Sequence, residues 1–254
     1  MSDSVLEIAN LSVTFGGVVA LDNVAFALGD TELLGLIGPN GAGKTTVMRS
    51  ITGVVRPDRG AIRLGGRELG SLPVHARIRA GLGLSQQLTR PFRTMTALDN
   101  VTLAAGLERT RRPLRAMFAS DRSAERGEAR RLLALVGIED ASDRTPDTLP
   151  LGYLKRLEMA RALALKPRLL LLDEPLAGLN HAEAAALADT VTSLNRQGLP
   201  ILLIEHNLGE VARICSHLVV LDNGRVLADG PTGTVLADTA VQDAYLGRGS
   251  HVAA

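Results

Sequence analysis

Residues 38–46 read GPNGAGKTT, a segment suited to binding the phosphates of a nucleotide. It matches the pattern G-x-x-x-x-G-K-[ST]. A polyphosphate is bulky and anionic, so the backbone must curl around it, and glycine permits the positive φ angles and the close approach that this requires. We expect Lys44 to reach the β- and γ-phosphates and the Thr45 hydroxyl to ligate Mg²⁺. The predicted phosphate-binding residues are Gly38, Pro39, Asn40, Gly41, Ala42, Gly43, Lys44, Thr45 and Thr46.

The segments on either side of this loop fit the same chemistry. Residues 32–37 (ELLGLI) predict a buried strand, and residues 44–52 predict a helix. The N-terminal N–H groups of such a helix would face the phosphates. A glycine-rich turn that only matches the pattern is the alternative, but it does not explain why strand, loop and helix follow in this order.

Two carboxylates follow a second apolar segment, RLLLLDEP at residues 168–175. A continuous apolar run predicts a strand in a parallel sheet that is covered on both faces. Ligands of such sheets bind at the carboxyl ends of the strands. Asp173 can therefore hold Mg²⁺ through its water shell, and Glu174 can orient or deprotonate an attacking water. The alternative is an ordinary pair of carboxylates between a strand and a turn. The presence of the phosphate loop in the same chain makes this alternative less favoured.

Composition narrows the classes of function. A chain of 254 residues can form one large domain, or one domain with an inserted lobe, around a substantial core. The 28 basic and 27 acidic residues give a net charge of +1, which supplies no field for holding nucleic acid. Aromatic residues make up only 2%, so there are no platforms for stacking single-stranded bases.

The remaining patterns predict neither a disulfide nor a zinc site. Cys215 is the only cysteine, which suits a reducing cytoplasm. The histidines other than His206 lack the spacing of metal ligands. No apolar run reaches ~18 residues, and the first ten residues do not resemble a signal peptide. A role at a membrane would therefore require another chain to span it.

Strand and helix patterns alternate along most of the chain and change in the middle. Between Gln87 and Lys166 no convincing strand is found, whereas helical patterns cover residues 97–105, 124–136 and 152–165. We interpret the chain as one domain with an α/β core and an inserted helical lobe. The predicted parts are the core at 1–87 and 166–246, the lobe at 88–165 and a frayed tail at 247–254.

Residues 109–131, within the predicted lobe, contain eight arginines. Because acidic residues alternate with them, a solvated helical surface explains the pattern. A surface near lipid headgroups or a membrane partner explains it as well.

Together these motifs resemble the ATP-binding subunit of an ABC transporter over essentially the whole chain. The resemblance is closer to the ATPase subunits of branched-chain (hydrophobic) amino acid importers. The segments that carry it are LSVTFGGVVALDNV at 11–24, FRTMTALDNV at 92–101, PLAGLN at 175–180, LLIEHN at 202–207 and AYLG at 244–247. The resemblance implies an α/β fold: a P-loop NTPase (RecA-like) core with a mixed sheet, an N-terminal antiparallel β subdomain and an inserted α-helical lobe.

The resemblance also implies roles for single residues. Phe15 matches the aromatic residue that stacks on adenine, with a core aromatic on a strand as the alternative. Gln87 matches the glutamine that meets Mg²⁺ and the attacking water, with Gln86 as the alternative register. His206 matches the histidine that contacts the γ-phosphate, with a satisfied structural histidine as the alternative. The implied catalytic residues are Glu174, His206, Gln87 and Lys44, and the implied metal ligands are Thr45, Gln87 and Asp173.

The signature segment departs from the family pattern. The family reads LSGGQ, and the amino acid importer branch often has proline and an aromatic residue at the second and third places. The corresponding residues here are Leu149, Pro150, Leu151, Gly152 and Tyr153. Pro150 offers phosphate neither a hydroxyl nor an N–H, and Tyr153 replaces glutamine.

The implied function is ATP hydrolysis, with Mg²⁺, that powers transport. Two ATPase subunits, identical or different, would close head to tail around two ATP molecules. Separate permease subunits would hold them on the cytoplasmic face of the cell membrane. The closer resemblance implies import of branched-chain or other hydrophobic amino acids with an extracytoplasmic solute-binding protein. The alternatives are an ATPase of a lipid or lipopolysaccharide exporter and a small-molecule P-loop kinase, which has no use for PLAGLN or His206.

Overall fold

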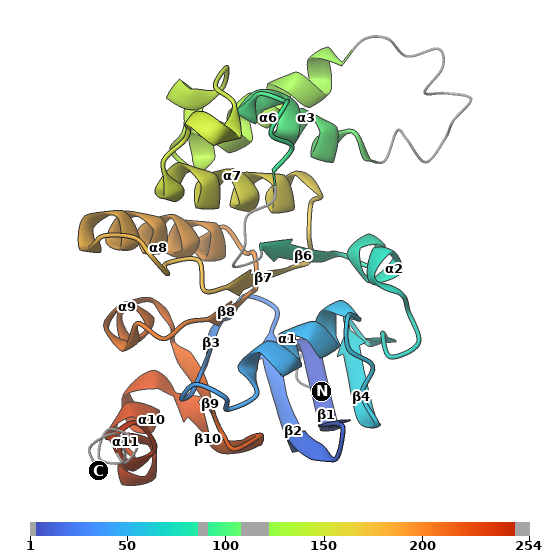
Figure 1. The fold of residues 1–254 in the computed structure, drawn as a ribbon, viewed down its shortest axis with the longest axis vertical. Helices are drawn as coiled ribbons and strands as arrows, with labels where there is room; N and C mark the ends of the chain where they lie inside the picture. Colours follow the sequence, from blue (N-terminus) through green and yellow to red (C-terminus); the bar gives the residue numbers. More distant parts are fainter. Residues whose placement is uncertain (1–3, 86–90, 108–121, 247–254) are drawn as a thin grey trace.

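The computed structural model describes residues 4–85, 91–107 and 122–246, which form two sheets and the helices around them (Figure 1). The central sheet has the strand order β10-β9-β3-β8-β7-β6, in which β10 runs antiparallel to β9 and the other neighbours are parallel. Its strands are β3 (Leu33–Ile37), β6 (Leu82–Ser85), β7 (Leu169–Asp173), β8 (Ile201–Ile204), β9 (His217–Asp222) and β10 (Arg225–Pro231).

The parallel strands are apolar throughout because both faces of the sheet are covered. Successive side chains of a strand point to opposite faces, so Leu170 and Leu172 of β7 join one buried cluster and Leu169 and Leu171 join the other. The elements that contribute to the first cluster include α8 (His181–Arg196) and α9 (Leu208–Ile214). The second includes α1 (Lys44–Thr52) and the other sheet.

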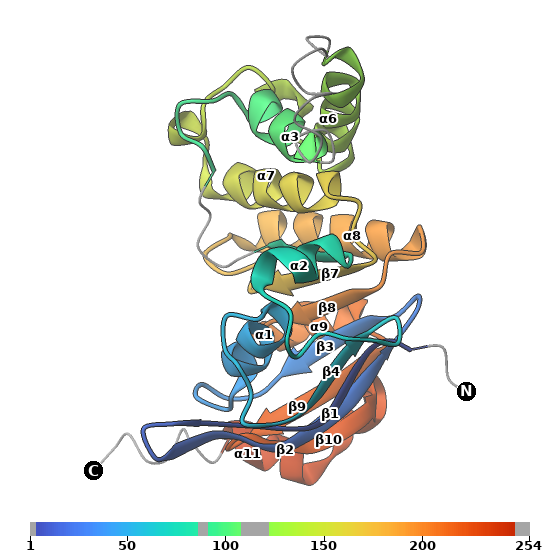
Figure 2. The ribbon, with the colours of Figure 1, turned by 90° about the vertical axis from the view of Figure 1, so that its right-hand side faces the viewer.

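The second sheet is antiparallel and has the order β2-β1-β4-β5. Its strands are β1 (Ser4–Phe15), β2 (Val18–Gly29), β4 (Arg59–Leu64) and β5 (Arg67–Glu68). Figure 2 shows this sheet beside the central one, at the end of the molecule away from the helical lobe. Its apolar side chains pack on α1, which carries the end of the phosphate loop.

Helices cover most of the described residues between the two halves of the core. They are α3 (Ala97–Ala105), α6 (Ser123–Leu135), η1 (Glu139–Ala141), η2 (Pro146–Thr148) and α7 (Leu151–Ala164). In Figure 1 they form the upper part of the molecule, with α7 lying above α8. Arginines in the described part of 109–131 make exposed ion pairs, Arg126 with Asp99 at 2.9 Å and Arg131 with Glu128 at 2.8 Å, as expected of a solvated helical surface.

One helix that the sequence analysis did not predict, α2 (Val74–Arg79), fixes the far end of α1. The guanidinium of Arg77 is almost fully buried and donates to the carbonyls of Ser50 at 2.6 Å and Ile51 at 2.8 Å. A cation at a helix C-terminus satisfies orphan carbonyls and complements the helix dipole. The helix that starts at the phosphate loop is therefore held at its other end.

Two short helices, α10 (Thr232–Ala237) and α11 (Thr239–Leu246), end the described chain. The predicted fold class is confirmed: an α/β core with a mixed sheet, an antiparallel β subdomain and a helical lobe. In the described ranges, no helix has the length and apolar character needed to cross a membrane.

Candidate active site

The phosphate loop connects β3 to α1 and requires glycine for two physical reasons. Gly38, Gly41 and Gly43 have φ angles of 146°, 82° and 105°. In addition, a Cβ atom at Gly38 would lie 2.1 Å from the carbonyl oxygen of Leu221, and one at Gly43 would lie 2.7 Å from a methyl group of Leu21. Only glycine combines this backbone with this close approach.

Lys44 begins α1 and folds back over the loop. Its Nζ donates to the carbonyls of Gly38 at 2.6 Å and Pro39 at 3.0 Å, and the residue is buried. Burial lowers the pKa of Lys44, an effect that the nearby charges of Glu174 and Asp173 oppose. The N-cap residue of α1, Gly43, has no side chain with which to cap the helix, so the ammonium and the first N–H groups of the helix form one cationic cradle. Thr45 is exposed at its rim.

The two predicted carboxylates stand at the carboxyl end of β7. Asp173 is the last residue of the strand. Burial and the neighbouring Glu174 charge raise the pKa of Asp173, while Arg49, Lys155 and Lys44 lower it. Half-buried carboxylates close to a cationic cradle and an exposed hydroxyl form a donor set that suits Mg²⁺, which takes few protein ligands and keeps several waters.

Glu174 adopts an unusual backbone conformation directly after β7. Its φ of 48° lies in the left-handed region, which costs a residue with a side chain ~1–2 kcal/mol. The Glu174 N–H donates to the carbonyl of Ile204 at 2.9 Å, and the Glu174 carbonyl accepts from Nζ of Lys155 at 2.9 Å. The surrounding elements thus hold the turn from which the Glu174 carboxylate extends.

His206 lies at the same edge of the sheet, two residues after the last residue of β8, Ile204. Its Nδ1 is 4.0 Å from a carboxylate oxygen of Glu174, and its side chain is 58% exposed. A satisfied structural histidine would be buried, so this exposure favours the ligand-facing alternative. The structure therefore brings Lys44, Asp173, Glu174 and His206 together where parallel sheets bind ligands.

Two further predicted site residues have different outcomes. Phe15 ends β1 and is 49% exposed, so it is not a core aromatic. The β2 residue Ala20 follows soon after it, and the Ala20 carbonyl would lie 2.9 Å from a Cβ at Gly43, so this hairpin packs near the phosphate loop. Gln87 and its alternative Gln86 lie outside the described residues.

The signature segment forms the start of α7, within the helical lobe. Leu149 is buried, Pro150 is the N-cap with no side-chain hydrogen bond, and Leu151 is 44% exposed. Gly152 is buried. The Tyr153 hydroxyl donates to the carboxylate of Asp140 at 3.1 Å, which raises the pKa of Tyr153. This end of α7 thus offers a ligand backbone N–H groups and apolar side chains.

The ABC transporter family model matches residues 21–177. The chain belongs to the ABC transporter family. It is 37% identical to the high-affinity branched-chain amino acid transport ATP-binding protein BraF of Pseudomonas aeruginosa, with coverage of 97% of this chain and 99% of that protein. It is 36% identical to the lipopolysaccharide export system ATP-binding protein LptB of Acidithiobacillus ferridurans, with coverage of 95% and 96%.

A solved structure confirms the architecture. The ADP conformation of MJ1267, an ATP-binding cassette of an ABC transporter, has a TM-score of 0.84 at 28% identity and covers 96% of this chain and 99% of that chain. The protein is therefore an ABC ATPase: it binds ATP, and its hydrolysis of ATP drives transport.

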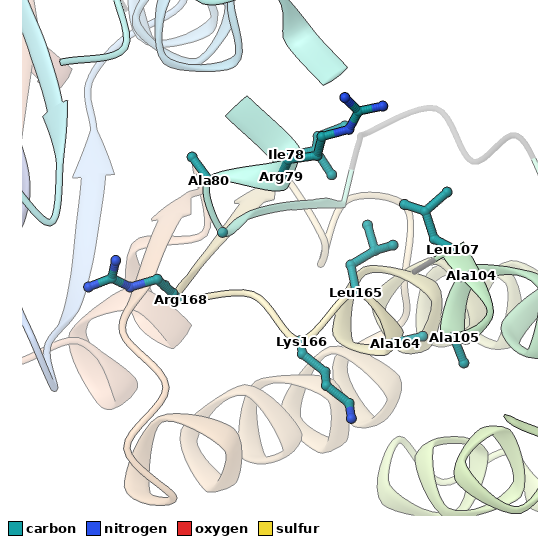
Figure 3. Close-up of a pocket in the computed structure, with 11 residues that line it drawn as sticks. Ile78, Arg79, Ala80, Ala104, Ala105, Leu107, Ala164, Leu165, Lys166 and Arg168 are labelled. Carbon is teal, nitrogen blue, oxygen red and sulfur yellow. The ribbon is translucent and has the colours of Figure 1, made fainter. Parts of the chain in front are cut away.

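A cavity of about 400 Å³ in this ABC ATPase lies away from the nucleotide site, between core and lobe (Figure 3). Its lining includes Gly81 and Arg168, which directly precede β6 and β7, so it sits at the amino ends of these strands. Apolar residues such as Leu107 and Leu165 line it together with basic residues that point in different directions.

Sequence reasoning missed two charged residues beside the site, Lys155 and Glu205, which are 5% and 0% exposed. A signal for each was available. Lys155 shares a helical stripe with Gly152 and Met159, both of which are buried. Glu205 follows an apolar strand at the sheet edge that carries Asp173.

Proposed function

We propose that Lys44, Asp173, Glu174 and His206 form the hydrolytic half of a composite ATP site in this ABC ATPase. The observation that carries the proposal is the convergence of these side chains at one sheet edge next to an uncapped helix N-terminus. The cradle around Lys44 would bind the β- and γ-phosphates. Phe15, exposed on the neighbouring hairpin, would stack on adenine.

Mg²⁺ would be held by Thr45, Asp173 and Gln87, and when bound it neutralises charge on the β- and γ-phosphate oxygens. Glu174 would accept a proton from the attacking water, and the turn that holds it fixes its direction. His206, 4.0 Å from that carboxylate, would donate to the γ-phosphate. Lys44 would stabilise the charge that develops on the transferring group.

The second half of the site would come from another ATPase subunit, identical or different. The exposed start of α7 would reach the partner's nucleotide through its N–H groups. The cavity between core and lobe is where we expect a segment of a membrane permease to dock. Through that permease the ATPase would lie on the cytoplasmic face of the cell membrane.

We further propose that the transporter imports branched-chain or other hydrophobic amino acids, aided by an extracytoplasmic solute-binding protein. The identity to BraF, and 37% identity to LivG of Salmonella typhimurium, support this substrate class. The test is uptake of radiolabelled leucine by cells that lack the gene and carry it back as wild type or as Glu174→Gln. Wild type should restore uptake and the variant should not. If cells that lack the gene take up leucine as well as cells that carry wild type, but are defective in lipopolysaccharide export, the proposal is contradicted.

A further inference from the structure

Two buried charged side chains contact the backbone around Glu174, the predicted hydrolytic carboxylate. Lys155 lies on α7 and Glu205 directly follows β8, and neither faces solvent. An ionised side chain is costly to bury unless hydrogen bonds or an opposite charge compensate the lost hydration. Both side chains are compensated in one place, the backbone that carries Glu174 and His206.

Lys155 acts on the Glu174 backbone. Its Nζ donates to the Glu174 carbonyl at 2.9 Å, while the Glu174 N–H donates to Ile204 at 2.9 Å. At a φ of 48°, Glu174 has a conformation that residues with side chains keep only where their surroundings enforce it. These two hydrogen bonds grip both sides of that residue, so they fix the direction in which its carboxylate extends.

Glu205 acts on the two segments that follow β7 and β8. Its Oε1 accepts from the N–H of Leu176 at 2.7 Å, and its Oε2 accepts from the N–H of His206 at 3.2 Å. One fully buried carboxylate thus joins the segment after Glu174 to the segment of His206. The side chains that these two segments carry approach each other, with His206 Nδ1 4.0 Å from Glu174 Oε2.

We propose that Lys155 and Glu205 are positioning residues for ATP hydrolysis, which hold the backbone from which Glu174 and His206 reach the reacting groups. The role rests on the proposed function, because it requires Glu174 to act on the attacking water. The hydrogen bonds of these two side chains go to the turn after β7 and to the backbone N–H of His206. Loss of either side chain should therefore slow turnover without weakening nucleotide binding.

The test compares Lys155→Met with Arg156→Met in the full chain together with the subunits that co-purify with it. Arg156 is the matched control, because it is the next residue of α7 and its Nη1 donates elsewhere, to the Val136 carbonyl at 2.7 Å and to the Thr190 hydroxyl of α8 at 3.2 Å. Lys155→Met should lower kcat at least about tenfold, since small displacements of a reacting group are costly. Both variants should keep the Kd for a fluorescent ATP analogue and lose similar amounts of Tm.

Conservative variants separate positioning from folding. Lys155→Arg keeps a charged donor and should recover part of the lost kcat. In Glu205→Gln the amide can accept only one of the two N–H groups, so kcat should fall there too. The double variant Lys155→Met/Glu205→Gln should lose less kcat than the product of the two separate fold-losses, because both side chains act on one turn.

Equal kcat values for Lys155→Met and Arg156→Met would overturn the positioning role. That result leaves the proposed function intact if Glu174→Gln abolishes turnover. If instead Glu174→Gln turns over like wild type, or the wild-type protein does not bind the ATP analogue, the proposed function is wrong and the positioning role falls with it.

Discussion

Two helices of this ABC ATPase begin where a phosphate could bind, and they present different chemistry. α1 starts at Gly43, in a loop whose glycines bring the backbone close, and its first residue is Lys44. α7 starts after Pro150, and its first residue is the half-exposed Leu151. The N-cap residues, Gly43 and Pro150, make no side-chain hydrogen bond to their helices, so both helix starts offer backbone N–H groups.

The difference lies in what surrounds these N–H groups. At α1 an ammonium, an exposed hydroxyl and two carboxylates lie near the helix start, which suits binding and reaction. At α7 the Tyr153 hydroxyl donates to Asp140 of the lobe. A phosphate at this helix start would therefore be bound by the helix dipole and the backbone N–H groups of α7. In the proposed dimer, each chain would thus supply more reactive groups to its own site than to its partner's.

Removal of Lys44 should have the largest effect, because it takes the fixed charge out of the stronger site. In Lys44→Ala, binding of a fluorescent ATP analogue should weaken by ~1.5–3 kcal/mol. Turnover should fall further, by ~100-fold or more, since developing charge is then less stabilised. Arg56→Ala, at an exposed arginine just beyond α1, is the control and should change neither. Equal affinity and turnover in both variants would show that the phosphates do not bind at α1.

Unequal sites should appear directly if the partner is a different ATPase chain. In the proposed composite dimer, the partner's signature segment would complete the Glu174 site, whereas this chain's Pro150 and Tyr153 would complete the other site. A missing hydrogen bond to phosphate charge costs ~1.5–3 kcal/mol, or roughly 10- to 100-fold in rate. In the co-purified pair, Glu174→Gln should remove most turnover and the partner's equivalent change little. Equal losses would mean that the departures at the signature segment have no effect or that the pair is a homodimer.

The sequence predicts some parts of the candidate site and not others. The phosphate loop is encoded locally, so its glycines, Lys44 and the following helix are readable from nine consecutive residues. The carboxylates after β7 are readable because an apolar strand precedes them. The sequence indicates that Lys155 and Glu205 lie near the site, but it does not give their roles, because these depend on hydrogen bonds to Glu174 and to Leu176 that form only in the folded chain.

Interrupted patterns hide some elements of the fold as well. Residues 24–28 predict only the second half of β2, because Asp22 and Asn23 interrupt the apolar pattern and Asn23 has a φ of 55°. The short α2 lacks enough turns for a helical period, yet its Arg77 anchors α1. The tie between Tyr153 and Asp140 joins residues in different elements, so only the fold shows that this hydroxyl is engaged.

Restoring polar groups at α7 should narrow the difference between the two sites by a smaller factor. Pro150→Ser adds a hydroxyl, and one such hydrogen bond to a ligand is worth ~0.5–1.5 kcal/mol, or about 2- to 10-fold in turnover at the weaker site. Combined with Tyr153→Gln it should exceed either change alone. Tyr153→Phe is the control, because it removes only the hydroxyl that donates to Asp140, and turnover should stay unchanged. If Pro150→Ser gives no gain in turnover, the backbone N–H groups at the start of α7 already provide all the hydrogen bonds that the phosphate needs there.

A third charged cluster lies apart from both helix starts. Changes there should alter the free energy of unfolding without altering ATP turnover. His217, at the start of β9, has its Nδ1 2.6 Å from Glu32 and its Nε2 2.6 Å from Asp229 of β10. Burial lowers the pKa of His217, but the hydrogen bonds and charges of the two carboxylates outweigh it, so the pKa is raised overall.

This cluster should affect unfolding and leave catalysis unchanged, which makes it the smallest of the expected effects on turnover. A raised pKa in the folded state means that protonated His217 stabilises the fold fully below its unfolded pKa of ~6.5, and that the stabilisation is lost as pH rises through the folded pKa. His217→Gln should therefore lower the unfolding free energy by roughly 1–2 kcal/mol at pH 6 and by less at pH 9. Urea unfolding at both pH values measures this, with ATPase activity at pH 7 as the second readout. A constant difference between the two pH values would show that folding does not shift the pKa of His217. A loss of turnover at unchanged stability would show that the cluster influences the α1 site after all.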